Sequence, residues 1–456
     1  MSTLQSNTDQ KLTKADFDAV DDKYRYWRNR ILFSSLIGYA FFYLVRKNFS
    51  FAMPGIATEL GLTKADLGIF ITLHGLLYGC SKFCNGIVGD RVNPRYFMAT
   101  GLILSAIMNF FFGMSSTAIA FGVFWMINGW TQGMGFPPCA KSLTHWFGPK
   151  ERAIKFSIWN TGHSIGAMLI AILAGYLAQH FGWRYAFYVP GAMAVAGAVF
   201  LLWALRDKPQ SMNLPPIDQY EKYRLGEPVN EDFIDSTENK EGKDSLSAFR
   251  HTLWHNVFMN PWIWIISIAN FFVYTVRYAI LDWGPTFLTE TKGVDISGAG
   301  WMVSAYEFSG IAGMLLSGWI TDKIFKGHGS RTCLIYMILC TGSLILFWQN
   351  TSTSIVINVA LLCAAGFLIY GPQCLVGVVA ANLATRKAAA TSIGLTGFFG
   401  YGSSILSGWG LGKIVDVYGW GTGYMVLAGA GAIASILFAI CWFSNDDGSK
   451  EYEQAN

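Results

Sequence analysis

Apolar stretches of about the 20 residues that a helix needs to cross a bilayer recur along nearly the whole chain. Charged residues are mostly confined to the two ends, a central segment and short connecting loops. Only 14% of the 456 residues are charged, whereas a soluble chain normally carries about 25%. The pattern predicts an all-α protein embedded in membrane lipid.

The apolar stretches fall into two groups of six, and each is expected to form a membrane-spanning helix. The first group covers about 31–54, 68–90, 98–115, 118–140, 154–180 and 185–205, and the second about 259–286, 297–321, 332–349, 353–376, 388–412 and 421–443. We therefore expect a tail (1–30), a six-helix half (31–205), a linker (206–258), a second half (259–443) and a short tail (444–456). The linker mixes charges with Pro, Gly and Ser, which predicts a solvated segment with at most a short amphipathic helix.

Positive charge in the short loops predicts the orientation in the membrane. Lys and Arg gather in the N-terminal tail and in alternate loops, whereas the other loops offer only Lys64, Arg184, Lys292 and Lys413. Cytoplasmic loops carry the excess of Lys and Arg. We therefore expect a protein of the cell (inner) membrane with both tails and the linker on the cytoplasmic side. A net charge of +4 sorted in this way gives no indication of nucleic acid as a partner.

The two halves share motifs at a nearly constant spacing. Gly86-Ile-Val-Gly-Asp90-Arg91 recurs as Gly318-Trp-Ile-Thr-Asp322-Lys323, an offset of 232 residues. Phe181-Gly182-Trp183 recurs as Tyr418-Gly419-Trp420, and Pro138 as Pro372, at similar offsets. Several markers at one offset indicate an internal duplication. Such repeats predict two parallel six-helix halves around an axis along the membrane normal, with a site between them near the midplane.

Two arginines stand inside predicted spans of opposite halves. Arg46 has Tyr39 and Tyr43 on the same helical face, and Arg277, at an offset of 231, has Tyr274 three residues before it. An arginine at the centre of a span costs at least about 2.5–3.5 kcal/mol, so each should face a polar interior. Two guanidinium forks could clamp one phosphate group. The alternative is that each pairs with a buried carboxylate and only holds helices together.

Lys82 and His163 also lie within predicted spans. Lys82, four residues after Tyr78, either adds positive charge to the same region or extends to the membrane surface. His163 follows Asn160 by three residues among small side chains. A lone buried histidine is more often a packed, hydrogen-bonded residue, but its titration near neutrality also suits it to sense phosphate ionisation.

Four acidic positions are candidates for a conformational switch. Asp282 and Glu307 lie inside spans, where a carboxylate needs a cationic partner or a proton. We expect them to pair with Arg or Lys in one state and to release it in another, because an acid beside a phosphate would repel it. The Asp90-Arg91 and Asp322-Lys323 pairs stand at helix ends after a glycine, which predicts a latch between neighbouring helices rather than a binding site.

Several functional classes have no support in the sequence. There is no Gly-x-x-x-x-Gly-Lys-Ser/Thr loop for nucleotide phosphates and no nucleophile elbow. The eight cysteines show no metal-ligand or CxxC spacing. We therefore expect no cofactor, no metal and no enzymatic activity.

Three motifs resemble the organophosphate:phosphate antiporters of the major facilitator superfamily. They are Tyr43-Leu-Val-Arg46-Lys47-Asn48-Phe49, Gly129-Trp-Thr-Gln132-Gly-Met-Gly-Phe-Pro-Pro138 and Arg277-Tyr-Ala-Ile-Leu-Asp282-Trp283, and the likeness runs from about Tyr24 to Phe443. The resemblance implies the fold of that superfamily and the exchange of an organic phosphate for inorganic phosphate by alternating access, without ATP. We expect a monomer to be the functional unit.

The resemblance also implies roles for individual residues. Arg46, Arg277, His163 and Lys82 match substrate-binding positions of the family, and Lys47, Asp282 and Glu307 match charged positions of its conformational cycle. The positions that match or adjoin its cavity lining are Tyr39, Tyr43, Tyr78, Gln132, Asn160, Tyr274, Tyr278, Tyr370 and Tyr401.

The branch of the family decides the expected substrate. The segment from Lys82 to Met98 and Ser407-Gly-Trp-Gly-Leu-Gly-Lys413 look most similar to the hexose-phosphate sensor and transporter group. Thr396–Trp409 carries no charge, unlike the main hexose-phosphate transporters, and Phe136 stands where the glycerol-phosphate branch has Trp. Glucose 6-phosphate is the first expectation and glycerol 3-phosphate the second. A sensor that binds hexose phosphate and signals to a membrane kinase is the alternative of another class.

Overall fold

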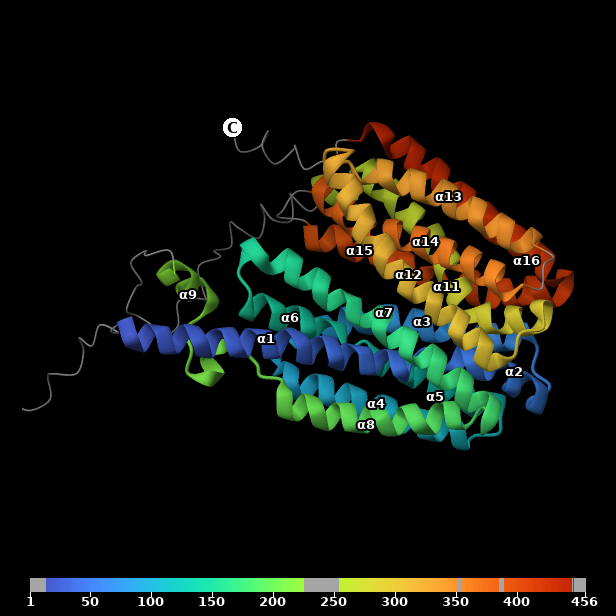
Figure 1. Cartoon of the computed structure of the whole chain (residues 1–456), viewed down its shortest axis with the longest axis horizontal. Helices are drawn as coiled ribbons and strands as arrows, with labels where there is room; N and C mark the ends of the chain where they lie inside the picture. The colour runs from blue at the N-terminus through green and yellow to red at the C-terminus, as the bar shows by residue number, and fades with distance from the viewer. Residues whose placement is uncertain (1–13, 225–253, 351–353, 385–388, 445, 447–456) are drawn as a thin grey trace, which may run out of the picture.

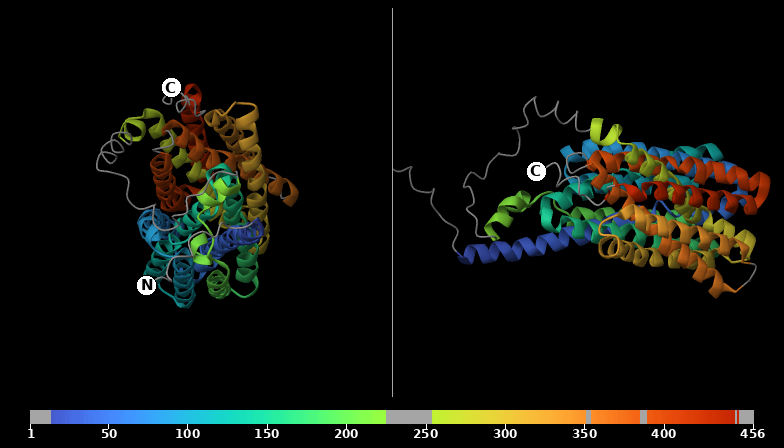
Figure 2. Two further views of the ribbon diagram at one scale, coloured as in Figure 1. Left: turned by 90° about the vertical axis from the view of Figure 1, so that its left-hand side faces the viewer. Right: turned by 90° about the horizontal axis from the view of Figure 1, so that it is seen from above.

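The computed structural model describes residues 14–224, 254–350, 354–384, 389–444 and 446, and every regular element in these ranges is helical. The helices run roughly parallel to one another in one elongated bundle (Figure 1). Seen along the bundle, the helices before the linker and those after it form two adjacent groups (Figure 2). This arrangement agrees with the all-α, two-half architecture predicted from the repeats.

The first half consists of α1 (Lys14–Leu44), α2 (Phe49–Leu60), α3 (Lys64–Arg91), α4 (Pro94–Met114), α5 (Ala118–Gln132), α6 (Phe136–Trp146), α7 (Pro149–His180) and α8 (Tyr185–Ala204). The short helices η1 (Pro209–Met212) and α9 (Ile217–Arg224) follow it. The second half consists of η2 (Trp254–Phe258), α11 (Pro261–Lys292), α12 (Ile296–Lys323), α13 (Gly329–Gln349), α14 (Ile355–Ala384), α15 (Ala389–Gly402), η4 (Ile405–Gly410), α16 (Leu411–Ile440) and η5 (Cys441–Phe443).

Helices occupy all of the predicted spans, but several of their limits differ from the prediction. Within the described ranges, eight helical runs are long and apolar enough to cross a membrane, and one of them, Thr391–Phe443, covers the last two predicted spans. The predicted spans 31–54 and 118–140 are each divided in two, by breaks at 45–48 and 133–135. The first helix begins at Lys14, well before the expected start near residue 31. The number of twelve crossings therefore stays a prediction.

The two ends of the chain lead to the same end of the bundle. The start of α1, beside α9, and the end of α16 lie at this end but in different halves, and the turn from α2 into α3 lies at the opposite end (Figure 1). We call these the tail end and the far end. At the tail end the α9 residue Tyr220 stacks on Tyr24 of α1, with ring centroids 3.9 Å apart. The tail end thus holds the start of the first half and the short helix α9 that follows this half.

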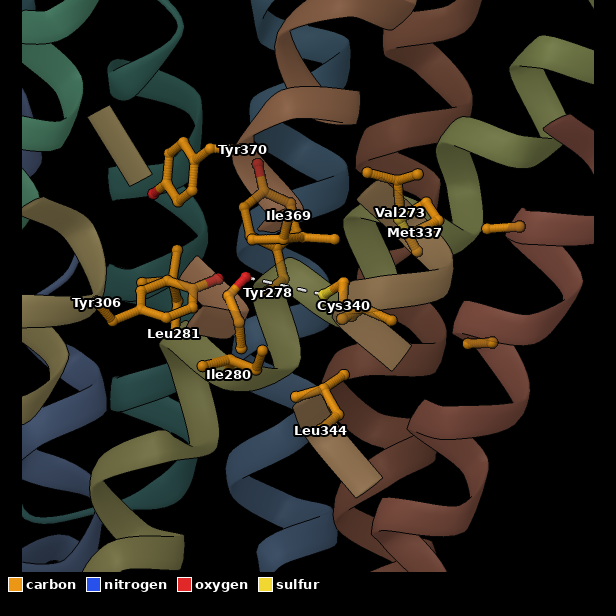
Figure 3. Packing of buried hydrophobic residues seen from close by; sticks show 14 of the residues in the cluster. Val273, Tyr278, Ile280, Leu281, Tyr306, Met337, Cys340, Leu344, Ile369 and Tyr370 are labelled. Carbon is orange, nitrogen blue, oxygen red and sulfur yellow. Dashed lines mark hydrogen bonds between the residues drawn. The ribbon is translucent and has the colours of Figure 1, made fainter. Parts of the chain in front are cut away.

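The buried apolar residues form three clusters, two of which contain residues of both halves. In the second half, Val273, Ile280 and Leu281 of α11 pack with Met337, Cys340 and Leu344 of α13 and with Ile369 of α14 (Figure 3). In the first half, a separate core is built around Leu102, Leu143 and Leu201. A third cluster, which includes Phe70 and Trp283, joins the two halves. Apolar packing therefore holds each half together and also joins the two halves in this state.

Glycines let the halves touch closely towards the far end. A Cβ atom on Gly300 of α12 would lie 2.3 Å from the carbonyl oxygen of Ala171 in α7. A Cβ atom on Gly68 of α3 would lie 2.6 Å from the carbonyl oxygen of Gly408 in η4. Gly68 and Gly300 are 232 positions apart, which is the offset of the repeated motifs. The two contacts are therefore equivalent in the two halves, and only glycine permits them at these distances.

Candidate functional site

Arg46 lies in the break between α1 and α2, not in a continuous helix as the sequence predicts. The reason is a set of buried amides on other helices. The carbonyl oxygen of Val45 accepts hydrogen bonds from the side chains of Asn109, over 3.1 Å, and Asn128, over 2.9 Å. The amide of Asn48 donates to the carbonyl oxygen of Ala186 over 2.9 Å. The two bonds to Val45 satisfy a backbone oxygen that the break releases from the helix, and the Asn48 bond ties the break to α8.

The Arg46 guanidinium is surrounded by tyrosine rings. It is buried, and its central carbon lies 3.8 Å from the ring centroid of Tyr78 and 5.4 Å from that of Tyr43. Cation–π contacts of this kind stabilise a desolvated cation without neutralising it. Among the described residues, no carboxylate forms an ion pair with Arg46. Its charge is therefore available to an anion.

Arg277 lies inside α11 and is also buried. Its Nη2 atom donates to the hydroxyl of Tyr370 over 3.0 Å, and that hydroxyl donates to Oε2 of Glu307 over 2.5 Å. The guanidinium thus reaches the carboxylate through a tyrosine and forms no direct ion pair with it. The Nε atom of Arg277 has no hydrogen-bond partner among the described groups. Donor capacity is left over for a ligand.

An ion pair joins the two halves beside the arginines. Nζ of Lys47 lies 2.5 Å from Oδ1 of Asp282, and both side chains are largely buried. The hydroxyl of Ser50 donates to the same carboxylate over 3.4 Å. The expected pairing of Asp282 with a cation is therefore present in this state. Its release in another state stays a prediction.

Lys82 and His163 extend the site between the halves. Nζ of Lys82 donates to the hydroxyl of Tyr401 over 3.4 Å and lies 3.8 Å from the ring centroid of Phe136. His163 Nδ1 bonds to the carbonyl oxygen of Asn160, and the imidazole lies 6.1 Å from the ring of Tyr370. Lys82 thus bonds to a tyrosine of the second half, and His163 lies beside another tyrosine of that half.

The remaining predicted cavity residues divide into two groups. Tyr39, Tyr43, Tyr274 and Tyr278 form ring contacts with other members of the site, and Asn160 reaches Met314 across the halves, with Nδ2 4.0 Å from Sδ. Gln132 differs, because it is buried within the first half and donates to Ser105 Oγ over 3.3 Å. Its predicted place in the cavity lining has no contact here to support it.

The predicted latch remains a prediction. Asp322 and Lys323 end α12 at the tail end and are exposed, and neither belongs to an ion pair between described residues. The side chains of Asp90 and Arg91 lie outside the described set. No group of three or more His, Cys, Asp and Glu side chains in the described ranges could hold a metal ion.

Sequence reasoning missed one histidine of the site. A small cavity lined by Lys47 and Asp282 is also lined by Arg46, His74 and Ser404. His74 is four residues before Tyr78 on α3, and the same spacing separates Tyr78 from Lys82. That helical spacing is the signal that could have identified it.

The pattern of this site, together with the two-half bundle, agrees with a family match. The family model described as Major Facilitator Superfamily matches residues 35–408. The chain belongs to this superfamily. It is therefore an integral membrane protein of a transporter family.

Relatives narrow the branch. The chain is 41% identical over 436 residues to the "Probable hexose phosphate transport protein" of Chlamydia pneumoniae, with 95% of each chain covered. It is 38% identical to the "Glycerol-3-phosphate transporter" of Bacillus subtilis, with 94% of this chain and 96% of the relative covered. It is also 38% identical to the "Membrane sensor protein UhpC" of Escherichia coli, with 92% and 93% covered. The resemblance to the organophosphate branch is confirmed.

Solved structures support the fold alone. The crystal structure of a bacterial homologue of the human lysosomal transporter Spinster, in an inward-facing and unoccupied conformation, matches with a TM-score of 0.68 and 17% identity. The match covers 94% of this chain and 98% of that one.

Proposed function

We propose that this protein is a secondary antiporter that exchanges a sugar phosphate, glucose 6-phosphate first, for inorganic phosphate by alternating access. The observation that carries the proposal is the pair of buried guanidiniums, one from each half, that have no direct carboxylate partner among the described residues. Two planar forks from opposite sides suit the oxygens of a phosphate dianion. The surrounding tyrosines leave the cations charged and partly desolvated, which strengthens their attraction for an anion.

The same charges explain why exchange is expected rather than one-way leakage. To pass from one open state to the other, the halves must close over the site. Without an anion, this closure would leave two cations buried and uncompensated, which is costly. A bound phosphate group neutralises them. The loaded protein should therefore reorient much faster than the empty one. After it releases its substrate on one side, it must bind a phosphate or a phosphate ester there before it can return.

The orientation belongs to the same proposal. The excess of Lys and Arg in the N-terminal tail and in alternate loops favours a cytoplasmic position for the tail end. Contacts between the halves gather at the far end: the Lys64–Glu290 ion pair of 3.1 Å and the bond from Ser297 N to Gln179 Oε1 of 2.9 Å both join them there. The described state is thus closed at the far end. We infer that it presents the site to the cytoplasm.

The test is uptake into liposomes that contain the purified protein. Labelled glucose 6-phosphate should enter phosphate-loaded vesicles and should not enter vesicles without internal phosphate or its esters. Uptake that ignores internal phosphate, or that needs ATP, would refute the exchange mechanism. A competition series with hexose phosphate, glycerol 3-phosphate and phosphoglycerate then ranks the substrates.

Two other candidates keep support from the relatives. The 38% identity to a glycerol-3-phosphate transporter makes glycerol 3-phosphate the second candidate for the substrate. The 38% identity to a membrane sensor favours a receptor that binds hexose phosphate and signals to a membrane kinase. Binding of glucose 6-phosphate without turnover in the liposome test would favour the sensor.

A further inference from the structure

His74 is a buried histidine with an unsatisfied ring nitrogen. Its exposed fraction is 6%, and its Nε2 atom has no hydrogen-bond partner among the described groups. Its ring stacks on Trp125 of α5, with centroids 4.8 Å apart and an angle of 28° between the planes. A buried polar atom without a partner costs free energy, and native proteins keep few of them. The position of His74 therefore calls for a functional explanation.

The surroundings of His74 favour an anion. It lines a cavity together with Arg46, Lys47, Asp282 and Tyr278. Lys47 is neutralised by Asp282 in this state, whereas Arg46 has no ion-pair partner in the described ranges. The lining thus carries an excess positive charge, contributed by the same guanidinium that we assign to phosphate binding.

His74 also continues a row of polar side chains along α3. His74, Tyr78 and Lys82 follow one another at four-residue spacing, so they lie on one helical face about 6 Å apart along the axis. Because α3 runs from the far end to the tail end, Lys82 is nearest the tail end and His74 nearest the far end. Tyr78, between them, packs on Arg46.

The cavity is small in the described state. Its volume of about 30 Å³ holds water but not a phosphate ester, for which pockets of about 300 Å³ or more are typical. Its walls come from both halves: His74 and Arg46 from the first, Tyr278, Asp282 and Ser404 from the second. Opening of the far end would separate these walls and widen the cavity towards the far end.

We propose that His74 is a further phosphate-binding residue, which donates its Nε2 hydrogen to a phosphate oxygen when the far end is open. The inference rests on the proposed exchange function and extends it. Lys82 then serves the phosphate group from the tail side, Arg46 holds it at the centre, and His74 serves it from the far side. The ligand class is a phosphate dianion, either inorganic phosphate or the head of an ester.

Two substitutions separate a hydrogen bond from a packing role. His74→Phe keeps a ring to stack on Trp125 but removes both nitrogens. His74→Gln loses the ring but keeps an amide that can donate. His180→Phe is the matched control, because His180 is an exposed histidine in the last turn of α7.

The measurement is the KM for labelled inorganic phosphate entering phosphate-loaded vesicles of known orientation, from the far side and from the tail side. We expect His74→Phe to raise the far-side KM by about tenfold, as for loss of one hydrogen bond to a charged group, with the tail-side KM changed less than about twofold. His74→Gln should stay within about threefold of the parent on both sides, and the control should match the parent.

Equal changes on the two sides, no change with Phe, or damage by Gln as large as that by Phe would overturn the role and leave His74 as a packed residue that bonds water. Failure of the parent itself to exchange phosphate would instead refute the proposed function. The two failures are therefore distinguishable.

Discussion

At the scale of single residues, the function depends on the two guanidinium forks. Arg46→Lys and Arg277→Lys each keep the charge but lose the planar, bidentate geometry, so we expect exchange to fall by about 100-fold or more. The measurement is initial uptake of glucose 6-phosphate into phosphate-loaded liposomes at matched protein content. Arg184→Lys is the control, since Arg184 pairs with Glu59 at the far end, 2.7 Å away, outside the site. Normal exchange by either site variant would refute the clamp.

The Lys47–Asp282 pair gives a second prediction at this scale. Removal of one partner leaves a buried charge uncompensated, so Lys47→Met alone should destabilise the protein by about 3–5 kcal/mol. Asp282→Leu alone should act similarly. The double variant should recover most of the stability, because both charges are gone, but not the exchange, if the pair works as a switch. Thermal unfolding in detergent and exchange in liposomes test the two parts. A double variant as unstable as the single ones would contradict the pairing.

The sequence predicts the charged part of this site better than its neutral part. Arg46, Arg277 and Asp282 stand out because a charge inside an apolar stretch is costly wherever the chain folds. His74 does not stand out, because an unpaired imidazole nitrogen becomes unusual only when the packing around it is known. Gln132 is the opposite case: its motif suggests the cavity, its amide bonds within the first half in this state, and its place in the lining stays a prediction.

At the scale of helices, the break at 45–48 could not be predicted from the local sequence. Val-Arg-Lys-Asn contains no glycine or proline to end a helix. The break exists because Asn109 and Asn128, on α4 and α5, bond the released carbonyl oxygen of Val45. The divided helix directs Arg46 towards the centre, whereas Arg277 reaches the centre from an unbroken helix. The two arginines are thus equivalent in sequence but not in backbone conformation.

The buried amides give a prediction about the break. Asn128→Leu removes a donor from Val45, so we expect a loss of about 1–3 kcal/mol in stability and about a tenfold weaker affinity for phosphate as Arg46 shifts. Asn270→Leu is the matched control, because Asn270 makes a similar bond to a backbone oxygen, that of Thr396, over 2.8 Å, away from Arg46. It should lose stability without losing affinity. Unfolding in detergent and equilibrium binding of labelled phosphate provide the two measurements. Equal affinity losses in both variants would show that the break has no special role.

At the scale of the whole molecule, the balance between the two open states depends on contacts at the far end. Asp416 of α16 accepts hydrogen bonds from the backbone N–H groups of Lys64, over 3.1 Å, and Ala65, over 2.6 Å, at the start of α3. A carboxylate at a helix N-terminus is stabilised by those donors and by the helix dipole. Because α3 and α16 belong to opposite halves, this contact exists only while the far end is closed.

Asp416→Asn should therefore shift the protein towards the far-open state. Loss of about 1 kcal/mol from the closed state alone changes the ratio of the two states by roughly fivefold. Asp295→Asn is the control, since Asp295 is also an exposed acid at a helix N-terminus of the far end but forms no capping bond. Spin labels at Ile119 of the first half and Tyr418 of the second, both exposed there, report the distance between the halves once the exposed Cys80 and Cys84 are replaced. We expect longer distances between the labels in Asp416→Asn but not in Asp295→Asn. If bound ligand, rather than this one contact, dominates the balance between the two open states, saturating phosphate should narrow the difference in distance between the two variants. Unchanged distances in both variants would place the closure energy in the Gly68–Gly408 and Ala171–Gly300 contacts instead.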